Sequence, residues 1–176
     1  SSSIEDFYKS LQMKIDIKEI DDFSFNRVVQ LIQKTNQFNL TTKRYSNNEI
    51  TDLRNNENYK IYTLELNDKF GSNGLVGVII SKFENNNCYI DTFILSCRVM
   101  GRTVETAFLS YICQKAKEYN CKYLIGEFIP TQKNKPVEDL YKNHGFISDD
   151  IENRYWTYNL KDTIKTPEYF ISILIA

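Results

Sequence analysis

Residues 98–103 form the stretch of the sequence best suited to bind a charged group. Arg98 and Arg102 supply full positive charges, and Gly101 allows a ligand to approach the backbone closely. The stretch lies between an apolar run of strand length and an amphipathic run with helical spacing. A turn of this kind directs free N–H groups and the positive end of a helix dipole toward one point. We therefore predict an anion site here, and a diphosphate is the ligand that suits it best.

Cys97 stands directly before this turn and is a candidate nucleophile. Positive charge from Arg98 and from the helix N-terminus would favour its thiolate form, which could attack an acyl donor to give a thioester. The alternative is a cysteine that packs at a strand end. We expect the other cysteines, Cys88, Cys113 and Cys121, to be structural and reduced. Because the sequence contains no C-x-x-C pair and a single histidine, we expect no metal site.

Side-chain amides are dense in residues 34–42, a stretch without glycine or proline. Asn36, Gln37 and Asn39 are candidates to form hydrogen bonds with a substrate. The alternative is a set of local caps and turns within an asparagine-rich loop.

Tyr141 and His144 lie on a short predicted helix and carry titratable side chains. Tyr141 is a candidate to donate a proton to a leaving thiolate. The alternative role for Tyr141 is to anchor the helix to the sheet. His144 precedes a glycine at the end of this helix, where a cap that favours the helix dipole is the simpler role.

The elements that must position these residues alternate between helical and extended patterns. The spacing of apolar residues predicts helices over residues 1–12, 23–34, 46–54, 104–120 and 136–143. It predicts strands over residues 13–20, 59–66, 75–83, 88–97, 122–129 and 154–160, with a short one beginning at Phe146. This order favours a single α/β (α+β) domain with a mixed sheet. The apolar tail, residues 169–176, either joins the sheet or packs on a partner.

Composition excludes several classes of protein. The chain has 176 residues, a net charge of −1 and 41% hydrophobic residues, which is typical of one globular domain. The charge balance gives no sign of a nucleic-acid-binding surface. No signal peptide or membrane-spanning run is present, so we expect a cytoplasmic protein that binds no membrane.

Two motifs resemble the GNAT acyltransferase superfamily. Arg98-x-x-Gly101-x-Thr103 resembles its acyl-CoA signature, R/Q-x-x-G-x-G/A, although Thr103 departs from the usual glycine or alanine. Residues 134–146 resemble its segment N-x-x-A-x-x-x-Y-x-x-x-G-F. The resemblance implies a GNAT fold, a mostly antiparallel sheet flanked by helices, that binds CoA or acetyl-CoA. It places Asn134 near the thiol end of the cofactor and makes Tyr141 a general acid. The implied cofactor-binding residues are Phe93, Leu95, Arg98, Val99, Met100, Gly101, Arg102, Thr103 and Asn134.

A narrower resemblance links most of the chain to the C-terminal half of FkbH-like proteins. Residues 30–42, 70–77, 91–102 and 126–131 carry it, and the runs KTNQFN and LSCRVMGR are the most specific. Members of this family usually carry an upstream HAD-type phosphatase-like domain, whose D-x-D-x-T motif is absent from this sequence. The family is associated with making glyceryl-S-acyl carrier protein from a phosphorylated glycerate. A phosphopantetheine arm on an acyl carrier protein would then replace free CoA.

Three functions follow from these resemblances. The first is transfer of an acyl or glyceryl group held as a thioester, with Cys97 and Tyr141 as catalytic candidates. The second is acetyl-CoA-dependent N-acetylation, in which Glu127 or Asp91 would act as the base for an amine acceptor. The third is a catalytically silent module that positions an acyl carrier protein, and Thr103 favours it.

Overall fold

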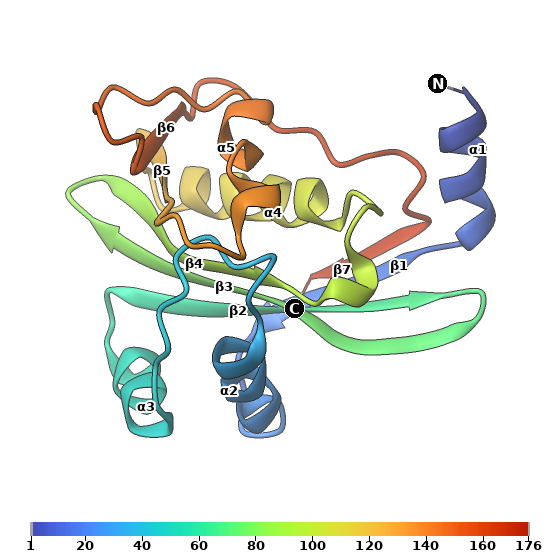
Figure 1. Cartoon of the computed structure of the whole chain (residues 1–176), viewed down its shortest axis with the longest axis horizontal. Coiled ribbons are helices and arrows are strands. Elements are labelled where there is room, and N and C mark those ends of the chain that lie inside the picture. Colours follow the sequence, from blue (N-terminus) through green and yellow to red (C-terminus); the bar gives the residue numbers. More distant parts are fainter. Residues whose placement is uncertain (1, 176) are drawn as a thin grey trace.

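A seven-stranded sheet organises the computed structural model, which describes residues 2–175 (Figure 1). The order across the sheet is β6-β5-β4-β3-β2-β1-β7, and all neighbouring pairs are antiparallel except β4–β5 and β1–β7. This architecture confirms the predicted mixed, mostly antiparallel sheet flanked by helices. The strands are β1 (Lys14–Glu19), β2 (Tyr59–Asp68), β3 (Gly71–Glu84), β4 (Asn87–Leu95), β5 (Tyr123–Glu127), β6 (Tyr155–Asn159) and β7 (Ser172–Ile175).

Helices cover both faces of the sheet. The α-helices are α1 (Ser2–Leu11), α2 (Phe25–Lys34), α3 (Asn47–Asn55), α4 (Val104–Glu118) and α5 (Leu140–Asn143), and two short 3₁₀ helices are η1 (Cys97–Val99) and η2 (Lys135–Val137). Helices α4 and α5 lie over one face, and α2 and α3 lie over the other (Figure 1). Each face has its own apolar cluster, one containing Phe108 and Tyr141 and the other Val28 and Ile50. The central strands are therefore buried on both sides, which explains their long apolar runs.

Local sequence signals account for several element boundaries. Helix α3 begins with a capping box: the Ser46 side chain accepts from the Glu49 N–H, and the Glu49 carboxylate accepts from the Ser46 N–H. In β1, Ile15 and Ile17 are buried while their charged neighbours are more exposed, as the alternating pattern predicts.

Two predicted elements differ from the structure. The helix predicted over residues 136–143 is split into η2 and α5, because Asp139 leaves helical geometry with φ −99° and ψ 10°. The strand predicted from Phe146 is reduced to one bridge between Ile147 and Thr157. The apolar tail joins the sheet, since β7 pairs in parallel with β1. Ser1 and Ala176, at the ends of the predicted elements, lie outside the described residues.

Candidate functional site

The strands β4 and β5 separate at the centre of the molecule. Their parallel pairing ends at Ile90 and Gly126. Beyond that point the chain's own residues 38–40 lie between them. The Leu40 N–H donates to the Phe93 carbonyl and the Leu95 N–H donates to the Phe38 carbonyl, both at 3.1 Å.

On the other side of this segment, the Ile129 N–H donates to the Leu40 carbonyl at 2.9 Å. Residues 38–40 therefore act as an additional short strand between β4 and the chain after β5. Phe93 and Leu95 were predicted to bind the cofactor through strand β4. In this structure their backbone groups are occupied by the chain itself.

Two buried asparagines hold the inserted segment in place. The Asn134 Nδ2 donates to the carbonyls of Asn39 at 3.0 Å and Ile129 at 2.9 Å. The Asn39 side chain donates to the Thr35 carbonyl at 3.1 Å and accepts from the Thr42 N–H at 2.8 Å. Both side chains are 0% exposed. The structure thus gives Asn39 and Asn134 internal partners in place of the predicted contacts with a ligand.

The predicted anion turn is covered by two tyrosines. Gly101 and Thr103 both adopt positive φ, +81° and +60°, which reverses the chain before α4. The Tyr8 hydroxyl donates to the Gly101 carbonyl at 2.6 Å, and the Thr103 hydroxyl is hydrogen-bonded to Tyr169. The rings of Tyr8 and Tyr169 lie 5.0 Å apart. The Thr103 hydroxyl, at the position where the acyl-CoA signature has glycine or alanine, is thereby turned toward the C-terminal tail.

The arginines of this turn bind the β2–β3 hairpin. Arg102 forms an ion pair with Asp68 at 2.8 Å, and Arg98 donates to the Asn73 carbonyl at 3.1 Å, so both contact the β2–β3 hairpin. Burial opposes the charge of Asp68, but the Phe70 N–H and then Arg102 outweigh it and lower the pKa of Asp68. Arg102 is therefore largely neutralised within the protein, whereas Arg98 has no ion pair among the described residues.

Val99 and Met100 complete the turn and are mainly structural. Val99 is 0% exposed, and Met100 packs against the apolar cluster under α4. Their N–H groups donate to the carbonyls of Ser96 and Cys97 at 3.1 and 3.4 Å. These two predicted cofactor ligands therefore use their N–H groups inside the 3₁₀ turn.

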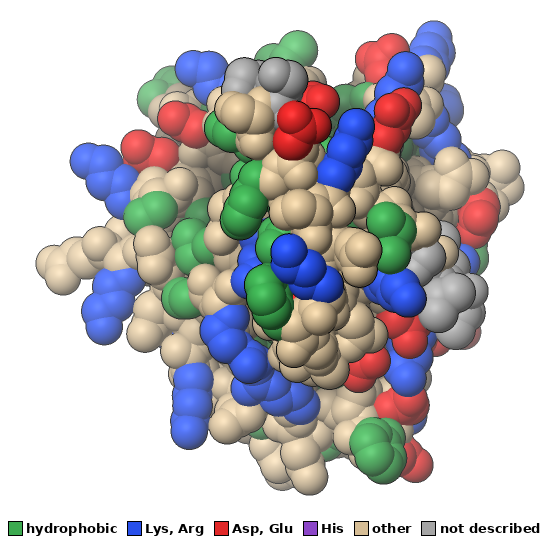
Figure 2. Space-filling view, turned by 90° about the vertical axis from the view of Figure 1, so that its right-hand side faces the viewer, with side chains coloured by type: hydrophobic (Ala, Val, Ile, Leu, Met, Phe, Trp, Pro, Cys, Tyr) green, Lys and Arg blue, Asp and Glu red, His purple; other side chains and the backbone are tan. Residues whose placement is uncertain are grey.

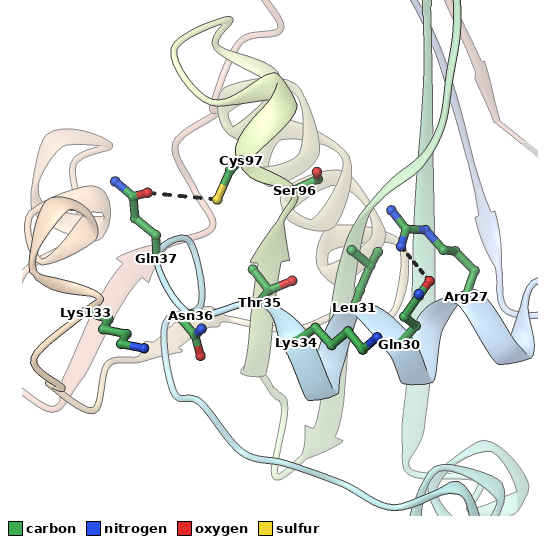
Figure 3. Close-up of a pocket in the computed structure, with 10 residues that line it drawn as sticks. All are labelled: Arg27, Gln30, Leu31, Lys34, Thr35, Asn36, Gln37, Ser96, Cys97 and Lys133. Atoms are coloured by element: carbon green, nitrogen blue, oxygen red, sulfur yellow. Dashed lines mark hydrogen bonds between the residues drawn. The ribbon is translucent and has the colours of Figure 1, made fainter.

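A cavity of about 560 Å³ opens beside Cys97 (Figure 3). The thiol is exposed, and its Sγ lies 3.9 Å from the Gln37 Oε1. The predicted residue Asn36 also lines the cavity, and its side chain accepts a hydrogen bond from Arg44. The full lining is Arg27, Gln30, Leu31, Lys34, Thr35, Asn36, Gln37, Ser96, Cys97 and Lys133.

The charge in this cavity is entirely positive. Its described lining includes Arg27, Lys34 and Lys133 and contains no carboxylate. Burial, and then the nearby Arg98, lower the pKa of Arg27. No ion pair within residues 2–175 involves the three lining cations or the nearby Arg98. Basic side chains also gather across the middle of the face that carries α1 and the β2–β3 hairpin (Figure 2). The cavity is therefore suited to an anionic molecule whose reactive carbon meets a thiol.

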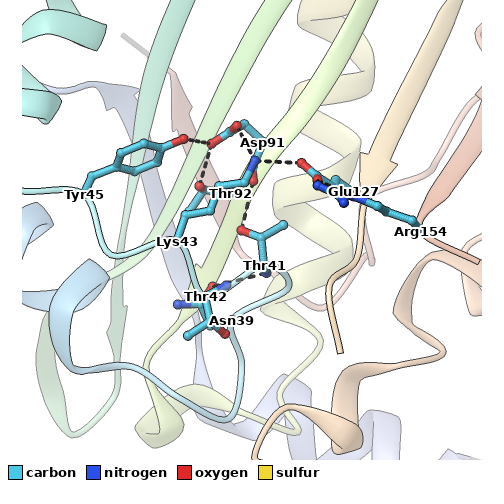
Figure 4. A network of polar contacts seen from close by, with 9 residues as sticks. All are labelled: Asn39, Thr41, Thr42, Lys43, Tyr45, Asp91, Thr92, Glu127 and Arg154. Atoms are coloured by element: carbon cyan, nitrogen blue, oxygen red, sulfur yellow. Dashed lines mark hydrogen bonds and ion pairs between the residues drawn. The ribbon is translucent and has the colours of Figure 1, made fainter. Parts of the chain in front are cut away.

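A second polar cluster lies where β4 and β5 separate (Figure 4). The Lys43 ammonium lies 2.7 Å from the Asp91 Oδ1 and 2.7 Å from the Glu127 Oε1. Arg154 donates to the second Glu127 oxygen through Nε at 2.8 Å and Nη2 at 2.6 Å. Tyr45 donates to the second Asp91 oxygen at 2.8 Å. All four carboxylate oxygens therefore have partners.

Lys43 and Tyr45 keep their protons in this cluster. Burial opposes the charge of Lys43, but hydrogen bonds and attraction from Asp91 and Glu127 outweigh it and raise the pKa of Lys43. Burial, and then Asp91, raise the pKa of Tyr45. Lys43 thus remains an ammonium, and the predicted base Glu127 has no free oxygen to accept a proton from a substrate.

Tyr141 lies under this cluster with its hydroxyl unpartnered. Its ring presses on Gly126, where an added Cβ would come 2.3 Å from the Tyr141 Cζ. The hydroxyl has no hydrogen-bond partner among the described residues. Burial, and then Glu127 and Asp91, raise the pKa of Tyr141. The structure therefore places Tyr141, the predicted proton donor, where β4 and β5 separate, and its raised pKa keeps the hydroxyl protonated.

The remaining candidates have structural surroundings. The His144 ring contacts the Leu140 carbonyl at 2.8 Å and the Thr106 hydroxyl at 2.7 Å, so it joins α5 to α4. Cys88 and Cys113 are buried, and burial raises the pKa of Cys88. Among the described residues, no group of three or more metal-binding side chains occurs. Within the same residues, no helix is long and apolar enough to cross a membrane.

Sequence reasoning missed six charged or polar residues that shape the site. They are Arg27, Lys34, Lys43, Tyr45, Lys133 and Arg154. Their spacing carries no local signal, because Lys43 meets partners 48 and 84 residues away. The exception is Lys34, which is the first residue of the amide-rich stretch and could have been included among its candidates.

Comparison with solved structures identifies the fold. A domain from Methanocaldococcus jannaschii matches with a TM-score of 0.65 at 16% identity, covering 84% of this chain and 99% of that one. Ard1 from Thermoplasma volcanium matches with a TM-score of 0.59 at 19% identity, covering 81% and 94%. The ribosomal-protein-S18-alanine N-acetyltransferase from Escherichia coli matches with a TM-score of 0.58 at 12% identity, covering 81% and 89%.

Comparison of the sequence with known proteins identifies the family. The search of curated proteins found no significant match. The model of the acetyltransferase (GNAT) family matches residues 25–146, which include β2 to β5, the turn before α4 and the whole of α5. The chain therefore belongs to the GNAT acetyltransferase family.

Proposed function

We propose that this chain accepts an acyl group as a thioester on Cys97 and passes it to the phosphopantetheine thiol of an acyl carrier protein. The family establishes a transferase that acts on acyl groups. The observation that carries the finer proposal is the exposed Cys97 thiol at a cavity lined by Arg27, Lys34 and Lys133, without a carboxylate in its described lining. The FkbH-like resemblance of the same segments supports a glyceryl group as the cargo.

Enzymes of the GNAT family use acetyl-CoA, but the predicted CoA ligands of this chain do not fit that cofactor. Arg102 is paired with Asp68, and Thr103 is bonded to Tyr169. We therefore derive the reaction from Cys97 and the cations around it.

The first step is the capture of the acyl group. The Cys97 thiolate attacks the carbonyl carbon of an acyl phosphate, a sulfur–carbon bond forms, and the carbon–oxygen bond to phosphate breaks. The leaving phosphate takes the electron pair. Arg27, Lys34 and Lys133 hold the anionic parts of the donor and stabilise the charge that develops on the leaving group.

The second step transfers the acyl group to the carrier protein and regenerates the free Cys97 thiolate. The thiolate of the carrier's pantetheine arm attacks the same carbonyl, the new thioester forms, and the Cys97 sulfur leaves with its electron pair. The FkbH-like resemblance implies that a HAD-type phosphatase-like domain accompanies this chain, while the acyl phosphate is supplied as a substrate. Acyl carrier protein and such a domain are the expected partners, and the expected location is the cytoplasm.

Acetyl-CoA-dependent N-acetylation is the second candidate function, favoured by the family match. It requires a base that takes a proton from the amine, and Asp91 and Glu127 are the predicted candidates. Because Lys43, Tyr45 and Arg154 occupy the oxygens of Asp91 and Glu127, the geometry favours the thiol acceptor.

Intact-protein mass spectrometry tests the proposal. We expect acetyl phosphate or an acyl phosphate of glycerate to add one acyl mass to the wild-type chain, and the Cys97→Ser variant to lose this adduct. Cys121→Ser, which removes a thiol of intermediate exposure, is the matched control and should retain the adduct. An equal adduct in Cys97→Ser, or acetylation of an amine by acetyl-CoA, would contradict the proposal. Unimpaired transfer in a folded Cys97→Ser variant would instead support the silent docking module.

A further inference from the structure

The β2–β3 hairpin, at the same end of the molecule as α1, exposes a large aromatic side chain on a rigid turn (Figure 1). Phe70 is 80% exposed, and the Lys69 ammonium lies 5.1 Å from the centre of its ring. The Asp68 carboxylate holds this turn from inside, because its two oxygens accept from the Phe70 N–H at 2.8 Å and the Asn73 Nδ2 at 3.3 Å. The Lys69 N–H donates to the Leu11 carbonyl at 2.8 Å, which ties the turn to the end of α1. An exposed ring on a fixed backbone loses little conformational entropy when a partner covers it.

The same hairpin is joined to the turn that carries Cys97. Arg98 donates to the Asn73 carbonyl at 3.1 Å. Arg27, which lines the cavity beside Cys97, donates to the Leu75 carbonyl at 3.3 Å. The tip of the hairpin lies five residues before Leu75, a span of about 17 Å along an extended strand. An extended phosphopantetheine arm is of comparable length, so a carrier that rests on the tip can place its thiol in the cavity.

The charge that the hairpin and the adjoining turn expose is positive. Asp68 is the only carboxylate of residues 67–74, and its side chain is 4% exposed and paired with Arg102. Lys69 and Arg98 are exposed and form no ion pair among the described residues. Acyl carrier proteins are acidic, and the phosphodiester that attaches the arm adds a negative charge where the arm leaves the carrier. Opposite charges of this kind steer two proteins together and fix their orientation.

We propose that Lys69 and Phe70, at the tip of the β2–β3 hairpin, form with Arg98 the docking surface for the acyl carrier protein. Phe70 packs against apolar side chains of the carrier, and Lys69 and Arg98 face its acidic side chains and the phosphodiester. The hydrogen bond from Arg98 to the hairpin keeps this surface beside the turn that carries Cys97. The inference rests on the proposed transfer of an acyl group from Cys97 to a carrier thiol, and it names the surface that favours the carrier over free thiols.

Isothermal titration calorimetry with the holo acyl carrier protein of bacterial fatty acid synthesis tests the surface without any acyl donor. We expect wild type to bind it, with an affinity that falls at least about tenfold between about 50 and 300 mM NaCl. At the lower salt concentration, Lys69→Glu and Phe70→Ser should each weaken binding at least about tenfold, because the first reverses a charge and the second removes the ring. Absence of binding by wild type, or equal affinity of all three proteins, would overturn the proposal.

Two variants near β6, at an edge of the sheet away from the hairpin, are the matched controls. Lys161→Glu makes the same change of charge at an exposed position after β6, and Ile151→Ser removes a fully exposed apolar side chain before it. Both should bind the carrier as wild type does. A loss in Lys161→Glu equal to that in Lys69→Glu would overturn the proposal. Sedimentation of the protein alone tests for a second copy of this chain on the hairpin, and a dimer that Phe70→Ser dissociates would overturn it as well.

A comparison of two acceptors links the surface to transfer. Protein acylated on Cys97 by acetyl phosphate is mixed with the holo carrier protein or with N-acetylcysteamine, which has the thiol but no protein surface. We expect Lys69→Glu to lower the rate of transfer to the carrier at least about tenfold and to leave the rate with N-acetylcysteamine unchanged. An equal loss with both acceptors would refute the docking role. Failure of Cys97 to become acylated would count against the proposed function alone, since the binding titration needs no acyl group.

Discussion

The hydroxyl of Tyr141 is buried and has no hydrogen-bond partner within residues 2–175, which is unusual for a polar group in a folded protein. Its ring packs directly against Gly126, and any larger residue at position 126 would clash with it. The hydroxyl is therefore the part of the side chain that packing alone does not explain. Such a group is either a tolerated cost or a group that acts on a ligand.

Replacement of Tyr141 by phenylalanine separates these roles. We expect Tyr141→Phe to raise the free energy of unfolding by about 1 kcal/mol, because it removes an unsatisfied buried group and keeps the ring. Urea unfolding measures this change. Tyr45→Phe should have the opposite sign, since the Tyr45 hydroxyl donates to Asp91. The predicted role as proton donor requires, in addition, a fall of about 100-fold in thioester transfer.

At the scale of elements, the inserted segment joins two strands that would otherwise stand apart. Residues 38–40 satisfy the backbone groups of β4 on one side and of Ile129 on the other. Asn134, from the loop before η2, bridges the segment and Ile129. The gap between β4 and β5 is thus filled by a loop that is held by its own backbone hydrogen bonds, by the Asn39 side chain and by the Asn134 amide.

Loss of that amide should loosen this region first. We expect Asn134→Ala to lower the free energy of unfolding by about 3 kcal/mol, because the buried Asn39 carbonyl and the part-buried Ile129 carbonyl lose their donor. Hydrogen exchange at the N–H groups of Leu40 and Ile129 should accelerate more than exchange in β3. Asn143→Ala, at an exposed position on α5, should change stability by no more than about 0.5 kcal/mol. Equal effects of the two variants would contradict this account.

At the scale of the whole molecule, the apolar core contains several tyrosines that must stay protonated. Burial raises the pKa of Tyr62 and Tyr141 above the ordinary tyrosine value of about 10, and it raises the pKa of Tyr111 to about 12. The folded chain thus binds more protons than the unfolded chain above pH 10. This difference stabilises the fold fully below that pH and is lost as pH rises through the folded-state values.

We therefore expect unfolding at alkaline pH. The free energy of unfolding should be insensitive to these tyrosines below about pH 9.5 and should fall steeply between pH 10 and 12, as urea midpoints across this range would show. Tyr62→Phe should reduce the slope, because one of the titrating groups is removed. Tyr155→Phe, at a position 43% exposed, should leave the slope unchanged. A slope that does not respond to Tyr62→Phe would contradict this assignment.

Much of the fold could be predicted from local patterns. The alternation in β1, the capping box of Ser46 and Glu49, and the glycine at position 101 each depend on a few neighbouring residues. The two motifs around residues 98–103 and 134–146 indicated the family that the comparisons show. These features are short-range, so the sequence alone contains the information.

The contents of the site depended on the tertiary structure. Lys43 meets Asp91 and Glu127 across 48 and 84 residues, and the cations beside Cys97 come from α2, η1 and the loop before η2. Residues 38–40 fill the gap between β4 and β5 only because the sheet brings these strands together and then separates them. By itself the sequence determined which chemical groups are available; strand register and burial, which act between distant segments, decided which of them remain free to react.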